Sequence, residues 1–177
     1  LKLRLTLDES APYKFPLRLT RKYFSSGSLL DKLARSLAKR DAIDMKEYAE
    51  SVEFFSHARP SWRKAVRKGS PSASIVVDLC CGHGFTGLLF AVFERECTKC
   101  ILADRSRPPS FDGILASVLE VAPWVRDKLD LELLGDGREH KGDLLLLSQN
   151  PNQYLPTGDF FSPNLVLLFH LSSNFFF

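Results

Sequence analysis

The sequence lacks any apolar run long enough to cross a membrane. A membrane-spanning helix needs about 18 or more consecutive apolar residues, and polar or charged residues interrupt every apolar stretch of this 177-residue chain before that length. No apolar block typical of a secretory signal lies near the start, where leucines alternate with charged and polar residues. We therefore expect an intracellular protein of the cytoplasm or nucleus, with no membrane partner. Because the chain begins at Leu1 rather than at methionine, an organelle stays open as a destination.

The chain also has little excess charge and few cysteines. It carries 24 lysines and arginines against 21 aspartates and glutamates, and this net charge of +3 does not by itself require a nucleic-acid partner. The four cysteines, Cys80, Cys81, Cys97 and Cys100, fall in one short region, whereas a disulfide framework distributes its cysteines more widely. Cys97-x-x-Cys100 has the spacing of zinc ligands, but the adjacent pair suits a tetrahedral site poorly. We predict reduced, buried thiols and no metal.

Residues 1–70 are predicted to form an N-terminal extension of one strand and several helices. Leucines alternate with polar residues over positions 1–7, a period of two that is typical of a half-buried strand. Pro12 and Pro16 then predict irregular chain. We expect this extension to cover a ligand site or to help bind substrate rather than to act as an independent domain.

Three helices are predicted in the extension. Ser28 and Asp31 have the spacing of a capping box, and apolar residues at helical spacing follow them. A second helix is predicted to begin at Asp44. A third, short helix is predicted over residues 61–68, closed by Gly69.

Beyond a linker at residues 70–74, strands and helices are predicted to alternate. This order is typical of a parallel sheet with right-handed crossovers, so residues 71–177 are expected to form an α/β domain. The predicted elements are a strand from 75, a helix over 85–96, a strand over 101–104, a helix opening at 108–110, a strand over 131–134 and a strand over 165–169.

A glycine-rich segment joins the first predicted strand to the helix that follows it. Gly82, Gly84 and Gly87 satisfy the pattern G-x-G-x-x-G, in which backbone passes close to a ligand and a pyrophosphate lies at the helix N-terminus. Asp104, at the end of the second predicted strand, could accept hydrogen bonds from ribose hydroxyls. A dinucleotide-dependent oxidoreductase is therefore one interpretation. A tight turn without a ligand is another.

Asp78, just before the glycines, favours a different ligand. A carboxylate at this place repels a pyrophosphate, whereas it suits a cation. The segment resembles motif I of the class I S-adenosylmethionine-dependent methyltransferases, usually written D/E-x-G-x-G-x-G. Asp78, Cys80, Gly82 and Gly84 map onto this motif, and Cys80 stands where the family usually has glycine.

The resemblance implies a Rossmann-like, mostly parallel sheet and S-adenosyl-L-methionine as methyl donor. Such a sheet has more strands than can be assigned here, so we expect an incomplete one whose C-terminal strands are missing. Asp78, Cys80, Gly82 and Gly84 are then expected to hold the amino-acid end of the donor. Asp104 is expected to bind its ribose, and Asp136, with Asp143 as a competing candidate, its adenine.

The resemblance implies that the chain is a methyltransferase. The alternative is a non-catalytic or degenerate module that binds S-adenosylmethionine. The catalytic base, the methyl acceptor and the oligomeric state stay unknown. His83 within the loop is expected to point to solvent or to pack over the ligand rather than to act as a base.

A basic cluster favours RNA as the acceptor over protein or a small molecule. It can follow a phosphate backbone while its tryptophan stacks on a base. The interpretation that we prefer is a solvated helix face with the tryptophan in the core. The cluster consists of Arg59, Trp62, Arg63, Lys64, Arg67 and Lys68.

Overall fold

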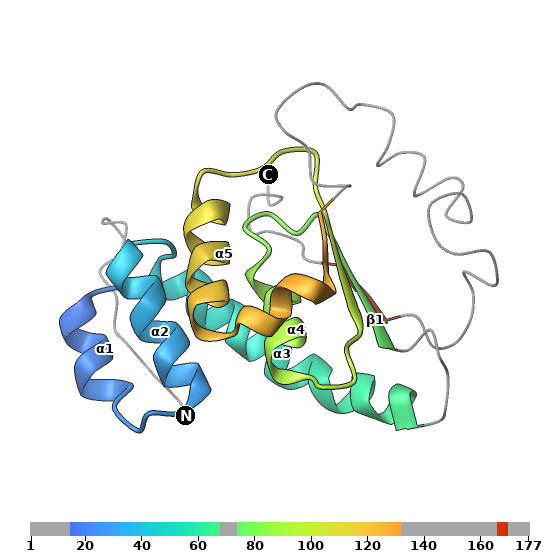
Figure 1. Ribbon diagram of the computed structural model, residues 1–177, viewed down its shortest axis with the longest axis horizontal. Coiled ribbons are helices and arrows are strands. Elements are labelled where there is room, and N and C mark those ends of the chain that lie inside the picture. Colours follow the sequence, from blue (N-terminus) through green and yellow to red (C-terminus); the bar gives the residue numbers. More distant parts are fainter. Residues whose placement is uncertain (1–14, 68–73, 132–165, 170–177) are drawn as a thin grey trace.

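The computed structural model describes residues 15–67, 74–131 and 166–169, and these form helices around a parallel sheet (Figure 1). The strands lie in the order β3-β2-β1-β4, and each neighbouring pair is parallel. Their bounds are Ile75–Leu79 for β1, Lys99–Ala103 for β2, Leu129–Asp130 for β3 and Val166–Phe169 for β4. The predicted α/β class, with strands that alternate with helices, is confirmed.

The helices precede and alternate with the strands. Their bounds are Leu17–Tyr23 for α1, Leu29–Arg40 for α2, Met45–Arg67 for α3, Phe85–Phe93 for α4 and Ser110–Val121 for α5, and a 3-10 helix, η2, spans Pro123–Lys128. The predicted cap of α2 is confirmed, because the Oγ of Ser28 accepts a hydrogen bond from the amide of Asp31 at 3.1 Å. The Oδ1 of Asp44 accepts from the amide of Glu47 at 2.7 Å and so satisfies a free amide in the first turn of α3.

The prediction of two separate helices between residues 44 and 68 is wrong, because α3 continues through Pro60. Proline has no N–H, so it removes the helical hydrogen bond to the carbonyl four residues earlier. Phe55 and Trp62 flank this position, are 6% and 1% exposed, and make edge contacts with Phe90 of α4. Burial of the two rings offsets the lost hydrogen bond, so α3 stays in one piece.

The irregular chain predicted after Pro16 is also corrected. Pro16 is instead the N-cap residue of α1, a place where the missing N–H of proline costs little. Phe15 beside it is 1% exposed, and its ring lies 5.8 Å from that of Phe24 and 4.7 Å from that of Tyr48. These aromatic contacts hold α1 against the start of α3.

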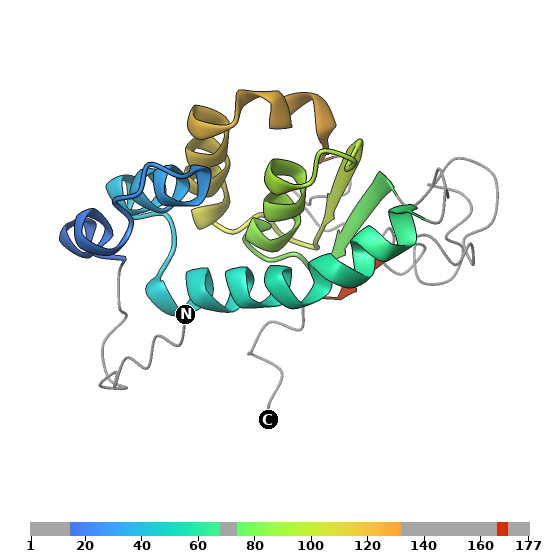
Figure 2. The same ribbon diagram turned by 90° about the horizontal axis from the view of Figure 1, so that it is seen from below.

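One hydrophobic core connects the helices to the sheet. Buried residues from Phe15 to Val125 belong to a single cluster, so the N-terminal helices and the sheet share one interior. α2 packs on α5, and α3 packs on α4. Figure 2 shows α4 between α3 on one side and α5 with η2 on the other. No helix in the described part of the chain is long and apolar enough to cross a membrane.

The register of the sheet brings the two predicted acidic positions to one edge. Leu79 at the end of β1 pairs with Ala103 at the end of β2, so the loop after β1 lies beside Asp104. The third strand begins earlier than the predicted range 131–134, at Leu129. The predicted strand over 1–7, most of the linker and Asp136 lie outside the described residues.

Candidate cofactor site

Asp78 is a buried carboxyl group that joins β1 to α4. It is 0% exposed, and its Oδ2 accepts a hydrogen bond from the amide of Gly87 at 2.9 Å. Its Oδ1 is also buried and has no hydrogen-bond partner among the described residues. A buried polar atom without a partner costs free energy. A hydrogen-bond donor or a cation that binds beside this oxygen would therefore be stabilised.

The charge of Asp78 depends on its surroundings near neutral pH. Burial raises the pKa of Asp78 from 3.8 to about 7, and the nearby charge of Asp104 adds to this rise. The hydrogen bond from Gly87 acts in the opposite direction. The carboxyl group therefore exchanges its proton close to physiological pH, and a bound cation favours the ionised form.

The loop between β1 and α4 is left-handed at three positions. Cys80, Gly82 and Gly84 have φ values of 55°, 52° and 70°. A Cβ atom added at Gly82 meets nothing within 4 Å among the described residues, so space adjoins the backbone there. A Cβ atom at Gly84 lies 3.1 Å from both Leu102 and Phe111, so this glycine is required by packing as well as by φ.

Gly87 is required by packing inside the protein. A Cβ atom there lies 2.7 Å from Cδ2 of Leu102 and 3.0 Å from Oδ2 of Asp78. The sequence pattern assigned the three glycines to one ligand, but the structure separates their roles. Gly82 borders open space, whereas Gly87 lets α4 approach β2 and lets Asp78 reach its amide.

Asp104 lies against the loop from the end of β2. Its Oδ2 accepts a hydrogen bond from the amide of Gly82 at 2.7 Å, and its Oδ1 accepts from the amide of Ser106 at 3.3 Å. The side chain is half-buried, and a carboxylate offers about four acceptor positions. Asp104 therefore has acceptor capacity left for a pair of hydroxyl groups while it orders the loop.

The structure brings together five of the six predicted cofactor-binding residues. Asp78, Cys80, Gly82 and Gly84 lie in or at the ends of one short loop, and Asp104 is hydrogen-bonded to it. Asp136, the predicted adenine contact, lies outside the described residues, so its role stays a prediction.

The cysteines correct one sequence prediction. Cys81, Cys97 and Cys100 are buried as predicted, but Cys80 is exposed at the start of the loop. Burial raises the pKa of Cys97 to about 11, which keeps that thiol protonated and unreactive at neutral pH. Within the described ranges, no group of three or more His, Cys, Asp or Glu side chains gathers closely enough to hold a metal ion.

His83 packs under the start of α3 instead of pointing to solvent. Its side chain is 11% exposed, its Nδ1 accepts from the amide of Phe85 at 3.2 Å, and its Nε2 lies 3.9 Å from Oε2 of Glu47. Burial raises the pKa of Glu47, and the charge of Asp44 adds to the effect. Sequence reasoning missed Glu47 as a neighbour of the loop, because its capping position predicts only where a helix begins.

Tyr48 is a second neighbour of the loop that the sequence did not reveal. Its ring stacks on that of Phe85 at 5.7 Å, and its buried hydroxyl has no hydrogen-bond partner in the part that the structure describes. The side chain belongs to an aromatic group with Phe15 and Phe24. The start of α3 therefore closes one side of the loop.

The basic cluster lies apart from this site. Trp62 is 1% exposed, so it lies in the core, as the preferred interpretation predicted, and its ring is not available to stack on a base. Arg59 and Arg63, however, are not simply solvated, since both form ion pairs with the fully buried Glu94. Lys68 lies outside the described residues.

Comparison with known proteins adds no assignment. No family model, no curated protein and no solved structure matches this chain. The loop and its two carboxyl groups are therefore the features that bear on function.

Proposed function

We propose that this chain binds S-adenosyl-L-methionine at the loop after β1 and transfers its methyl group to an acceptor. The observation that carries the proposal is the pair of carboxyl groups around the loop, Asp78 beneath it and Asp104 beside it. The bound donor supplies an electrophilic methyl group on a positively charged sulfur, together with a positively charged amino group. Two acids and an open left-handed loop suit such a phosphate-free cation.

The strand order supports a Rossmann-like arrangement. In open parallel sheets, ligands bind at the carboxyl ends of the strands, where the chain order reverses direction. In the order β3-β2-β1-β4 this reversal falls at β1, whose carboxyl end carries the loop. The position of the site therefore agrees with its proposed role.

Each described residue has a defined part in the proposed site. Asp78, through its unpartnered Oδ1, attracts the amino group of the donor. The loop backbone at Cys80, Gly82 and Gly84 holds the amino-acid portion, which occupies the open space beside Gly82. Asp104 accepts hydrogen bonds from the ribose hydroxyls. The protein then contributes positioning and exclusion of water.

A dinucleotide is a poorer fit to the same loop. Pyrophosphate binding needs free backbone amides, and the amide of Gly82 already donates to Asp104 at 2.7 Å. The two carboxyl groups also repel a phosphate when they are ionised. These observations favour the sulfonium donor over NAD.

Calorimetric titration with S-adenosylhomocysteine and with NAD tests the proposal. We expect the full chain to bind S-adenosylhomocysteine and to show no heat of binding with NAD. Asp104→Asn should weaken S-adenosylhomocysteine binding by about tenfold or more, because the neutral amide still accepts from Gly82 but is a weaker acceptor for hydroxyls. The matched control is Asp127→Asn on the exposed side of η2, which should bind like the wild type. Binding of NAD without binding of S-adenosylhomocysteine would overturn the proposal.

A further inference from the structure

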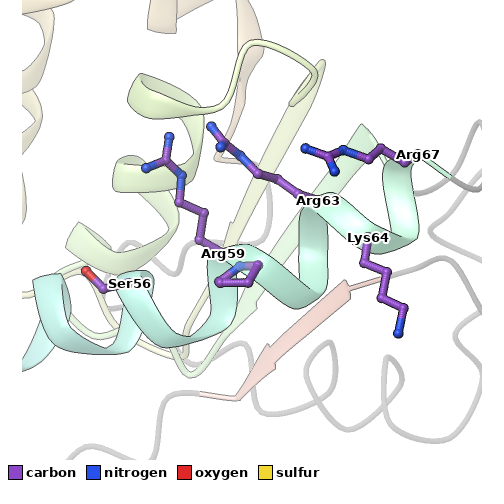
Figure 3. A pocket seen from close by; sticks show the side chains of 6 residues that line it. Ser56, Arg59, Arg63, Lys64 and Arg67 are labelled. Carbon is purple, nitrogen blue, oxygen red and sulfur yellow. The ribbon is translucent and has the colours of Figure 1, made fainter.

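A basic groove follows the second half of α3. It encloses about 660 Å³ and is lined by Ser56, Arg59, Pro60, Arg63, Lys64 and Arg67. The three arginines recur every four residues, so they extend from the same side of the helix, whereas Lys64 extends from another side (Figure 3). Successive arginines are about 6 Å apart along the helix axis.

A buried acid orients two of the arginines. Glu94 is 0% exposed, and its two carboxylate oxygens accept from Nε of Arg59 and from Nε of Arg63, the latter at 2.8 Å. In both residues Nε is the atom used, and the terminal Nη groups have no acceptor among the described residues. A guanidinium held through Nε can still donate hydrogen bonds from its two coplanar Nη groups to an oxyanion.

The groove carries more positive charge than Glu94 neutralises. Arg67 and Lys64 are exposed and have no acidic partner in the described ranges. Lys128 already donates to the carbonyls of Ala91 and Glu94 at 3.0 and 3.1 Å, and so satisfies the C-terminal end of α4. Glu96 lies close enough to help raise the pKa of Arg63, after the larger effect of Glu94. The surplus of cations in one hollow points to an anionic partner.

The groove lies too far from the loop after β1 for one small ligand to contact both. Gly84 caps the N-terminal end of α4, and Glu94 follows its C-terminal end. The nine residues between them span about 13 Å. A small anion in the groove therefore cannot also reach the donor site, whereas a polymer can occupy both.

We propose that the groove docks the phosphate backbone of a single-stranded nucleic acid, part of which reaches the loop as the methyl acceptor. This inference rests on the proposed function. Equally spaced, planar guanidinium groups suit an anion that repeats at a constant interval, as phosphates do along a strand. The acidic side chains of a peptide repeat less regularly. Because Trp62 is buried, the groove contacts the backbone without reading bases.

Fluorescence anisotropy with the full chain tests the docking site. The probes are a labelled 15-nucleotide oligouridine, the corresponding deoxyoligonucleotide and polyglutamate of equal charge. The groove variant is Lys64→Gln/Arg67→Gln, whose residues are exposed and do not contact Glu94. The matched control is Arg18→Gln/Arg21→Gln, which removes the same charge from exposed positions on α1.

We expect the groove variant to bind the oligouridine about tenfold more weakly, and the control to change affinity by less than about twofold. The dependence of log affinity on log salt should fall by about 1.4 if two phosphate contacts are lost. Binding of either oligonucleotide supports docking of the backbone. The oligonucleotide that binds more tightly shows whether the natural partner is RNA or DNA. Equal losses in both variants, no binding, or equally tight binding of polyglutamate overturns the inference.

Titration with S-adenosylhomocysteine separates the two proposals. The groove variant should bind S-adenosylhomocysteine like the wild type. If the wild type binds S-adenosylhomocysteine but no oligonucleotide, the docking inference fails alone. If it binds the oligonucleotide at the groove but no S-adenosylhomocysteine, the proposed function and the acceptor role fail, and only nucleic-acid binding stands.

Discussion

At the scale of single residues, Asp78 makes the stability of the protein depend on pH. Its pKa is 3.8 in the reference state and about 7 in the folded protein because of burial. Between these values the folded state binds more protons than the unfolded chain. The contribution of Asp78 to stability is therefore greatest at low pH and is lost progressively as pH rises towards about 7.

Asp78→Asn should remove this dependence. The asparagine oxygen can still accept from the amide of Gly87, but the side chain cannot ionise. We expect the variant to gain stability relative to the wild type as pH rises from about 5 to about 8, measured as the free energy of unfolding in urea. Asp127→Asn, at an exposed position, should follow the wild type. A difference between Asp78→Asn and wild type that does not change with pH contradicts the assignment.

Gly87→Ala tests the packing role of the third glycine. Alanine is the better helix former, but its Cβ atom would lie 2.7 Å from Leu102 and 3.0 Å from Asp78. We expect a net loss of about 1–3 kcal/mol in the free energy of unfolding, since the crowded atoms belong to a buried interface. Unchanged stability in urea denaturation would show that β2 and α4 can separate without cost.

At the scale of elements, Glu94 fixes the second half of α3 to the end of α4. Arg59→Ala/Arg63→Ala leaves this fully buried carboxylate without its two partners. We expect Tm to fall by about 5 °C or more in a thermal melt. Lys64→Gln/Arg67→Gln on the same helix should leave Tm nearly unchanged. Equal effects of the two double variants would show that total charge, and not the contact with Glu94, decides stability.

The elements that the sequence predicted well have local or periodic signals. Ser28 and Asp31 mark the start of α2, and the alternation of strands and helices after residue 75 predicts the parallel sheet. Since parallel strands end at one edge, the sequence also predicts that Asp78 and Asp104 lie near the same loop, and they do.

The elements that the sequence mispredicted depend on contacts between distant residues. Pro60 predicts a break by its local chemistry, but burial of Phe55 and Trp62 on Phe90 keeps α3 continuous. The ion pair of Arg59 with Glu94 joins residues 35 positions apart and has no periodic signature. The contact of Glu47 with His83 also joins residues far apart in the sequence, so no local pattern predicts it.

At the scale of the whole molecule, the N-terminal helices and the sheet depend on one core. α2 is tied to α5 by a hydrogen bond of 2.7 Å from Ser36 to Glu120 and by the ion pair of Arg40 with Glu120. The aromatic contacts of α3 cover α4. Neither part buries these surfaces alone.

A fragment of residues 74–177 should therefore fail to unfold cooperatively. Removal of α1, α2 and α3 exposes apolar surface of α4 that α3 covers in the whole chain, such as the fully buried Phe90. We expect a broad thermal transition by circular dichroism and binding of a hydrophobic dye, whereas the full chain shows one sharp transition. A fragment with a sharp transition and no dye binding would show that the sheet folds independently.

If the proposed function holds, the unpartnered oxygen of Asp78 also makes binding of the methyl donor depend on pH. With a pKa of about 7, the carboxyl group of Asp78 holds a proton in much of the population at neutral pH. A cation that binds beside the carboxylate displaces that proton into the medium. Under the proposed function, binding of the methyl donor would be an exchange of one positive charge for another. A small fall in pH within a compartment would lower the loaded fraction of the protein without any change in donor concentration.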